Sequence, residues 1–202
     1  YKRQGQKTGF FLDQRENRLA ARSFTKGLEV LNCFSYTGAF TVHAALAKAS
    51  RVVSVDVSEP ATELALKNLE LNRLSSEDHP VVVDNTFDFL KQCHSTDTRF
   101  DVLIVDPPAF VKTREALTRA VQAYISLNRK AIGVLRPGGV LITASCSTQV
   151  DYDCFFSIVK HAAAAEGREI QIVKTHLQAV DHPVSVSFPE GQYLKCLIGI
   201  VN

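Results

Sequence analysis

The residues best suited to chemistry lie in two short segments, Asp106-Pro107-Pro108-Ala109-Phe110 and Ser145-Cys146-Ser147. Two consecutive prolines fix the backbone and remove two N–H donors, so the acid and the aromatic ring of the first segment project at fixed angles. Such a loop can hold a flat base, with Phe110 stacking on it and Asp106 accepting a hydrogen bond from an exocyclic amine. Base–aromatic stacking contributes on the order of 1–3 kcal/mol, enough to hold a base outside its stack. The alternative interpretation is a turn that buries a phenylalanine.

The second segment offers a nucleophile, Cys146. Carbon 5 of cytosine is a poor nucleophile, and methylating it requires a thiolate that first adds to carbon 6. A free thiol has a pKa of about 8.5 and is only a few per cent ionised at neutral pH, so the site must lower that pKa or use a base. A buried structural cysteine is the alternative. The position of Cys146 opposite the Asp106 loop favours the nucleophile.

The elements that position these segments follow from short apolar runs that alternate with helical patterns, as is typical of βαβ units around a mostly parallel sheet. The predicted strands are Glu29–Asn32, Arg51–Asp56, Val81–Val83, Asp101–Asp106, Val140–Ser145, Glu169–Lys174 and Tyr193–Val201. Only a polar, proline-containing connection separates the last two, which predicts an antiparallel pair at the sheet edge. Residues 1–202 are therefore predicted to form one α/β domain: a doubly wound, mostly parallel seven-stranded sheet with an antiparallel edge hairpin, Rossmann-like as in class I methyltransferases.

Two helices have clear boundaries in the sequence. One begins after Ser58, a good N-cap residue followed by Pro60 in the first turn. The other runs from about Thr113 to Leu135 and is predicted to stop at Arg136-Pro137-Gly138-Gly139.

The first predicted strand leads into Asn32–Phe40, a segment with one glycine, Gly38. In open parallel sheets ligands bind beyond the carboxyl ends of the strands. A loop that closes on a pyrophosphate needs three glycines, so NAD and FAD are disfavoured. S-adenosylmethionine (SAM) has no phosphate, and hydroxyls such as those of Ser35 and Thr37 can meet its amino-acid end.

Acids follow the next two strands as well. Asp56 ends the second strand 18 residues after Gly38, near the interval expected of a carboxylate that accepts both ribose hydroxyls. Asp84-Asn85 follows the third strand, where an acid can take the adenine amino group and Phe87 offers an apolar wall. Each residue alone could be a helix N-cap. Their occurrence at successive strand ends predicts SAM as the cofactor.

The composition and charge of the chain limit the classes of protein and of partner to be considered. The chain has 202 residues, 46% hydrophobic and 22% charged, with a formal net charge of +2. Residues 1–26 carry a local balance of +5, so a basic edge is predicted to meet phosphate, with a solvated helix face as the alternative. The basic residues are Lys2, Arg3, Lys7, Arg15, Arg18, Arg22 and Lys26.

The five cysteines show no C-x-x-C pairing, so neither a zinc site nor a disulfide framework is predicted, and a reducing cytoplasm is the simplest setting. Cys93, Cys154 and Cys196 are expected in the core, whereas Cys33 is expected near the cofactor. No apolar run approaches the roughly 20 residues of a membrane span, and no membrane association is predicted. The sequence leaves the oligomeric state open, a homodimer included.

Several segments resemble the bacterial 23S rRNA large-subunit cytosine-5 methyltransferases. They are Gln6–Arg15, Asn32–Phe40, Val53–Ser58, Asp106–Val111, Ser145–Ser147, Asp181–Pro183 and Pro189–Gly191. The resemblance implies a longer protein with an N-terminal PUA-like RNA-binding domain and, as partner, large-subunit rRNA or an assembling ribosomal particle. It also implies that Gln6–Arg15 covers the cofactor, which adds Phe10 and Arg15 to the candidate cofactor residues, together with Asn32 and Ser58.

One departure from the wider RNA cytosine-5 pattern concerns product release. Many such enzymes carry a second cysteine just after the proline of the fourth-strand segment, where this chain has Ala109. The group that removes the carbon 5 proton is therefore not assigned by the sequence. His182 is one candidate, and a packed structural histidine is its alternative. Two other functions stay open: methylation of a guanine nitrogen, and a non-catalytic rRNA-binding assembly factor.

Overall fold

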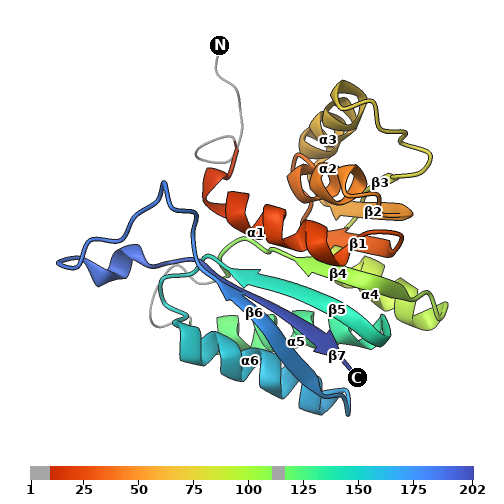
Figure 1. Ribbon diagram of the computed structural model, residues 1–202. Helices are drawn as coiled ribbons and strands as arrows, with labels where there is room; N and C mark the ends of the chain where they lie inside the picture. Colours follow the sequence, from red (N-terminus) through yellow and green to blue (C-terminus); the bar gives the residue numbers. More distant parts are fainter. Residues whose placement is uncertain (1–9, 111–116) are drawn as a thin grey trace.

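In the computed structural model, which describes residues 10–110 and 117–202, one seven-stranded sheet has the order β3-β2-β1-β4-β5-β7-β6 (Figure 1). Its strands are β1 (Glu29–Cys33), β2 (Arg51–Asp56), β3 (Val81–Val83), β4 (Phe100–Val105), β5 (Leu135–Ser145), β6 (Ile170–His176) and β7 (Lys195–Val201). The first five pair in parallel, while β7 runs antiparallel to both β5 and β6. The predicted fold, with its antiparallel edge pair, is confirmed.

Helices cover both faces of the sheet (Figure 1). Those of the described residues are α1 (Arg15–Ala21), α2 (Ala39–Leu46), α3 (Glu59–Leu71), α4 (Thr86–Ser95), α5 (Leu117–Gly133) and α6 (Tyr152–Ala165), with short 3-10 turns η1 (Leu12–Gln14), η2 (Arg22–Phe24) and η4 (Pro189–Gly191). Neighbouring strand residues point to opposite faces. Val30 accordingly packs in a cluster with α1 and α2, whereas Leu31 packs in a second cluster with α4, α5 and α6.

The predicted end of the long helix at Leu135 and the predicted start of the fifth strand at Val140 were wrong. The segment Arg136-Pro137-Gly138-Gly139 does not end a helix, because α5 already stops at Gly133 and the segment lies inside β5. It forms a bulge: the pairing passes from Phe100↔Leu135 directly to Val102↔Val140. A side chain at Gly139 would lie 2.8 Å from the Arg136 carbonyl, which explains a glycine there. The predicted start of this helix at Thr113 falls outside the described residues.

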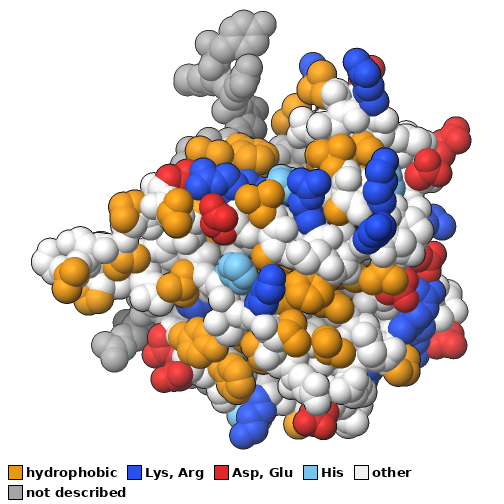
Figure 2. Space-filling model, in the orientation of Figure 1, with side chains coloured by type: hydrophobic (Ala, Val, Ile, Leu, Met, Phe, Trp, Pro, Cys, Tyr) orange, Lys and Arg blue, Asp and Glu red, His pale blue; other side chains and the backbone are white. Residues whose placement is uncertain are grey.

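The connection between β6 and β7 projects from the body of the domain (Figure 1). It carries only the turn η4 and an isolated bridge between Ser185 and Phe188. Hydrophobic side chains are exposed along it, Val186 completely (Figure 2). Among the described residues, no helix has the length and apolarity needed to cross a bilayer.

Candidate active site

The parallel register brings the ends of four strands to one edge of the sheet. Cys33 of β1 pairs with Val55 of β2 and with Val105 of β4, and Val105 pairs with Thr143 of β5. The residues that follow these strands therefore lie side by side. They include the predicted cofactor loop, Asp56, Asp106 and Cys146.

The loop after β1 has an unusual backbone that Asp56 holds in place. Phe34, Tyr36 and Gly38 all have positive φ, at 55°, 48° and 75°. One carboxylate oxygen of Asp56 accepts from the Tyr36 amide at 2.8 Å, and the other accepts from the Ser58 amide at 2.9 Å. Non-glycine residues in this region are strained and concentrate at functional sites. The Tyr36 contribution, a backbone amide, was not predicted from the sequence.

Gly38 is required where the loop enters α2. A Cβ there would lie 2.9 Å from the Cβ of Ala65 in α3, and the carbonyl of Thr37 accepts a hydrogen bond from Asn68 of the same helix at 2.8 Å. The loop is thus fixed against α3. No side chain caps the first turn of α2, which leaves backbone N–H groups there for a ligand.

The donors around this loop suit an amino-acid carboxylate. Anions bind well at a helix N-terminus because its N–H groups point outward and its dipole is positive. The Ser35 hydroxyl beside it is buried and has no hydrogen-bond partner among the described residues. A buried polar atom without a partner is costly, so a ligand that supplies one is favoured. These features fit the amino-acid end of SAM.

Other predicted cofactor residues have partners within the protein. Asn32 is buried and donates to the Thr41 hydroxyl at 2.9 Å, behind the loop. Asn85 caps α4, since its side chain accepts from the Phe87 amide at 2.9 Å. The backbone amide of Asp84 donates to the Asp56 carbonyl at 3.0 Å, so the two acids lie on neighbouring strand ends as expected. Ser58 is the N-cap residue of α3, although its hydroxyl makes no capping bond.

Asp106 is bound by a residue the sequence did not single out. The Gln14 side chain, from η1, donates to a carboxylate oxygen of Asp106 at 2.8 Å, and Asn17 fixes the Gln14 amide by donating to its oxygen at 2.6 Å. Burial raises the pKa of Asp106 to about 7, the charge of Asp13 adds to the rise, and Gln14 and Arg18 oppose it. The carboxyl is therefore partly protonated near neutral pH.

Tyr124 of α5 joins the Asp106 loop to the Cys146 segment. Its ring packs on that of Phe110, with centroids 4.6 Å apart and planes at 49°. Its hydroxyl accepts from the Ser145 hydroxyl at 3.2 Å. The Phe87 ring also lies near that of Phe110, with centroids 6.4 Å apart, so two aromatic side chains border the half-buried Phe110 ring, and one of them, Tyr124, is bonded to the residue before Cys146.

Cys146 lies half-buried at the end of β5. Burial raises the pKa of its thiol to about 11, and the nearby charge of Asp106 adds to this rise. The thiol is protonated at neutral pH in this state, so its reactivity depends on what binds beside it. As predicted, Cys93 and Cys196 are buried in the core and Cys154 packs against it. Cys33 is fully buried, and burial raises the pKa of its thiol well above the ordinary range.

A buried lysine holds the Cys146 segment from the neighbouring strand. Lys195 pairs with Ser145 in the sheet, and its ammonium donates to the carbonyls of Ser147 at 2.6 Å and Tyr193 at 2.9 Å. Burial lowers the pKa of Lys195 to about 8. The only signal in the sequence was a lysine in an otherwise apolar strand.

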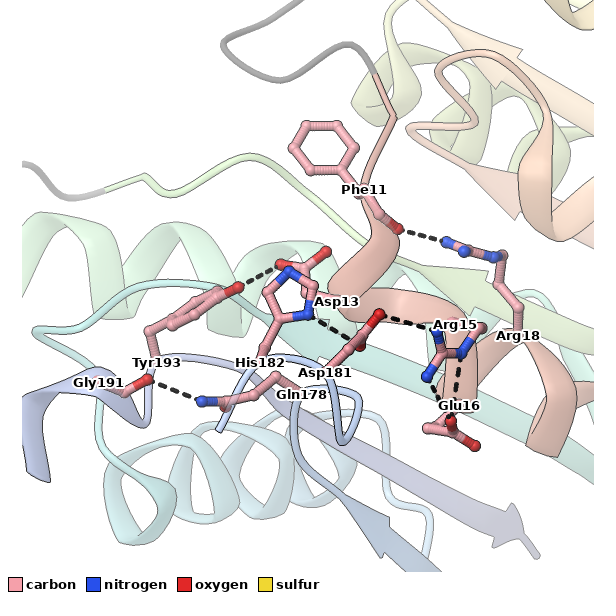
Figure 3. Close-up of polar contacts among 10 residues, drawn as sticks. All are labelled: Phe11, Asp13, Arg15, Glu16, Arg18, Gln178, Asp181, His182, Gly191 and Tyr193. Atoms are coloured by element: carbon pink, nitrogen blue, oxygen red, sulfur yellow. Dashed lines mark hydrogen bonds and ion pairs between the residues drawn. The ribbon is translucent and has the colours of Figure 1, made fainter. Parts of the chain in front are cut away.

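The N-terminal segment closes over this edge and contacts the β6–β7 connection (Figure 3). Asp13 accepts from the Tyr193 hydroxyl at 2.6 Å, and Arg15 pairs with Asp181 at 2.8 Å. The Phe11 ring packs edge-on against Tyr36 of the cofactor loop, with centroids 5.5 Å apart. The segment therefore contacts that loop through Phe11; residues 6–9 lie outside the described part of the chain.

Three further predicted residues make contacts within the N-terminal segment and the β6–β7 connection. The Arg18 guanidinium lies 4.8 Å from the centroid of the exposed Phe10 ring and donates to the Phe11 carbonyl at 2.7 Å. Because Arg18 is only 3% exposed, it is not available to an external phosphate. His182 pairs through Nδ1 with Asp181 at 3.0 Å. Lys and Arg side chains lie among hydrophobic and acidic ones on the face of α1, α2 and α3 (Figure 2).

Comparison with known proteins identifies the family. A family model described as S-adenosylmethionine-dependent methyltransferase matches residues 2–183. The "Ribosomal RNA large subunit methyltransferase I" of Serratia proteamaculans is 45% identical over 192 residues, which cover 95% of this chain and 48% of that protein. Its counterpart in Yersinia pestis gives the same figures. The chain thus spans about half the length of the curated relatives that it matches.

A solved structure supports the same assignment. It is assigned as a methyltransferase, is complexed with SAH, and superposes with a TM-score of 0.85 at 28% identity, covering 95% of this chain and 50% of that one. The cofactor predicted from the strand ends, SAM, is thereby confirmed at the level of the family. This chain belongs to the S-adenosylmethionine-dependent methyltransferases.

Proposed function

We propose that this chain is the catalytic domain of an enzyme that methylates carbon 5 of a cytosine in large-subunit ribosomal RNA through a covalent adduct on Cys146. The observation that carries the proposal is the placement of Cys146 beside the Asp106–Phe110 loop, with Tyr124 bonded to Ser145 and packed on Phe110. The names of the relatives support the ribosomal substrate.

SAM supplies the methyl group on a positively charged sulfur. Asp56 is proposed to bind the ribose, Asp84 the adenine amino group, and the Ser35–Gly38 loop with the first turn of α2 the amino-acid end. Phe10 and Arg15 complete the cover from above. Asn32 and Asn85 are proposed to hold the neighbouring backbone in place rather than to bind SAM, because Asn32 donates to Thr41 and Asn85 caps α4.

Asp106 and Phe110 are proposed to bind the cytosine. A carboxylic acid donates through one oxygen and accepts through the other, so a protonated Asp106 can donate to ring nitrogen 3 and accept from the amino group on carbon 4. Its pKa of about 7 makes the protonated form accessible at neutral pH. Protonating nitrogen 3 draws electrons from carbon 6 and favours attack there by sulfur. This compensates for a Cys146 thiol that is protonated in the free site.

Cys146 then bonds through sulfur to carbon 6, and its proton passes to the Asp106 carboxylate, which has given its own proton to ring nitrogen 3. The electron pair of the carbon 5–carbon 6 double bond becomes available at carbon 5, which takes the methyl group. Loss of the carbon 5 proton restores the double bond and releases the cysteine.

Arg22 and Lys26, which are exposed beyond α1, are proposed phosphate contacts. An N-terminal PUA-like domain, a homodimer and a cytoplasmic location remain predictions.

The experiment that tests the proposal uses large-subunit rRNA that carries tritium at carbon 5 of its cytosines. Methylation at that carbon releases tritium to water, one equivalent for each methyl group transferred. The full-length protein should release it, and Cys146→Ser should reduce the release at least 100-fold while SAM binding is retained. Methyl transfer without tritium release would refute the proposal and favour a guanine nitrogen. Absence of both would favour the non-catalytic assembly factor.

A further inference from the structure

The Asp13 carboxyl lies at the same edge as Cys146 and has no assigned part in the reaction. We propose that Asp13 is the base that removes the carbon 5 proton and so releases the product from Cys146. The inference rests on the proposed function and assigns the group that the sequence left open. Ala109, where related enzymes have a second cysteine, cannot do this work.

Two hydrogen bonds hold Asp13 in place, one to its carboxyl group and one to its backbone carbonyl. One oxygen accepts from the Tyr193 hydroxyl at 2.6 Å, and the backbone carbonyl accepts from the Ala179 amide at 2.9 Å. The other carboxyl oxygen is buried and has no hydrogen-bond partner among the residues that the structure describes (Figure 3). A carboxylate oriented in this way keeps one oxygen free to accept a proton.

Asp13 is linked to both halves of the reaction site. The Lys195 ammonium bonds the carbonyls of Tyr193 and Ser147, which places the Asp13–Tyr193 pair next to the Cys146 segment. The following residue, Gln14, binds Asp106. The negative charge of Asp13 also contributes to the raised pKa of both Asp106 and Cys146, as expected of a near neighbour.

The order of the strands puts Asp13 on the required side. Cys146 follows β5, Tyr193 precedes β7, and the cofactor strands β1 and β2 lie beyond β4 on the opposite side of β5. We take sulfur and methyl to add to opposite faces of the cytosine, sulfur from the side of β5 and methyl from the side of β1 and β2. The carbon 5 hydrogen then lies on the face of the sulfur, which is the side from which the Asp13–Tyr193 pair reaches the site.

The release step needs no reactant other than Asp13 and the Cys146 adduct. Asp13 takes the carbon 5 proton, and the electrons of that carbon–hydrogen bond form the carbon 5–carbon 6 double bond. The carbon 6–sulfur bond breaks, and its electron pair leaves with Cys146 as thiolate.

Two neighbouring groups are less suited to this step. Lys195 donates to the carbonyls of Ser147 and Tyr193, and its pKa of about 8 keeps it mostly as the ammonium, which has no lone pair, at neutral pH. His182 is paired with Asp181, which in turn binds Arg15. That network belongs to the surface of the N-terminal segment.

The test measures a protein–RNA adduct that survives denaturing electrophoresis, using the full-length protein, SAM and large-subunit rRNA. Asp13→Asn keeps the size of the side chain and its contact with Tyr193 but cannot take a proton. We expect this variant to accumulate a methylated adduct at least 10-fold above wild type, with turnover reduced about 10²- to 10⁴-fold. Glu16→Gln, a matched change three residues along the same segment, should behave as wild type.

RNA that contains 5-fluorocytidine separates this inference from the function on which it rests. A base can remove a proton from carbon 5 but not a fluorine, so the covalent adduct with fluorinated RNA cannot be released. Wild type and Asp13→Asn should therefore form equal amounts of this adduct, and Cys146→Ser should form none. No trapping of wild type would overturn the proposed function. Equal trapping on fluorinated RNA, without excess Asp13→Asn adduct on ordinary RNA, would overturn the assignment of Asp13. Accumulation of adduct by His182→Asn instead would transfer the role to His182.

Discussion

Gly38 should be among the positions least tolerant of alanine, for two separable reasons. Its φ of 75° is left-handed, and a Cβ there would meet Ala65 at 2.9 Å. The backbone conformation costs an L-residue about 1–2 kcal/mol. Crowding against a packed helix adds about 1–3 kcal/mol, because the neighbouring atoms belong to Ala65 of α3 rather than to a flexible chain end. Gly38→Ala should therefore lower the free energy of unfolding by about 2–5 kcal/mol.

Gly27 provides the matched control. Its φ is 74°, and nothing lies within 4 Å of the Cβ it would carry. Gly27→Ala should show only the backbone cost, so the difference between the two variants measures the contact with Ala65. In urea denaturation, Gly38→Ala combined with Ala65→Gly should recover about 1–3 kcal/mol of coupling energy. Equal losses for Gly27→Ala and Gly38→Ala would refute the close packing of the cofactor loop on α3.

Three further predictions concern ionisable groups. The pKa of Asp106 is raised to about 7 in the folded state, so protonation of this carboxyl stabilises the folded protein at acid pH. That stabilisation is lost as the pH rises from about 4 to 7. The free energy of unfolding of Asp106→Asn should lack this part of the pH dependence. Alkylation of Cys146 by iodoacetamide, followed by peptide mass spectrometry, should accelerate about tenfold per pH unit up to its pKa of about 11, and a plateau near pH 8 would contradict this. Lys195→Met leaves two carbonyls without their donor and should destabilise the protein by about 2–4 kcal/mol in urea denaturation; a loss under 1 kcal/mol would show that the ammonium does not hold the Cys146 segment.

The parts of the fold predicted best from sequence are those set by local pattern. Strands β2 and β3 have the predicted bounds because each is a valine-rich segment that ends at or just before an acid. The start of β5 was missed because Pro137 and two glycines resemble a helix stop. Only the pairing with Phe100 and Val102 shows that these residues form a bulge inside a strand.

The predicted site was incomplete where contacts join distant parts of the chain. Gln14 and Asp106 are 92 residues apart, and Asp13 and Tyr193 are 180 apart. Tyr124 reads as an ordinary aromatic on the apolar face of a helix, yet its ring packs on that of Phe110. No local pattern marks such residues, because their roles arise only when the N-terminal segment, α5 and the last strand meet at one edge of the sheet.

The central claim is methylation of carbon 5 of a cytosine by way of Cys146. Its most direct test is nucleoside mass spectrometry of large-subunit rRNA from cells that lack the full-length protein and are complemented with wild type or with Cys146→Ser. We expect one 5-methylcytidine that wild type restores and Cys146→Ser does not. Restoration by Cys146→Ser, or dependence of a methylated guanosine instead, would contradict it.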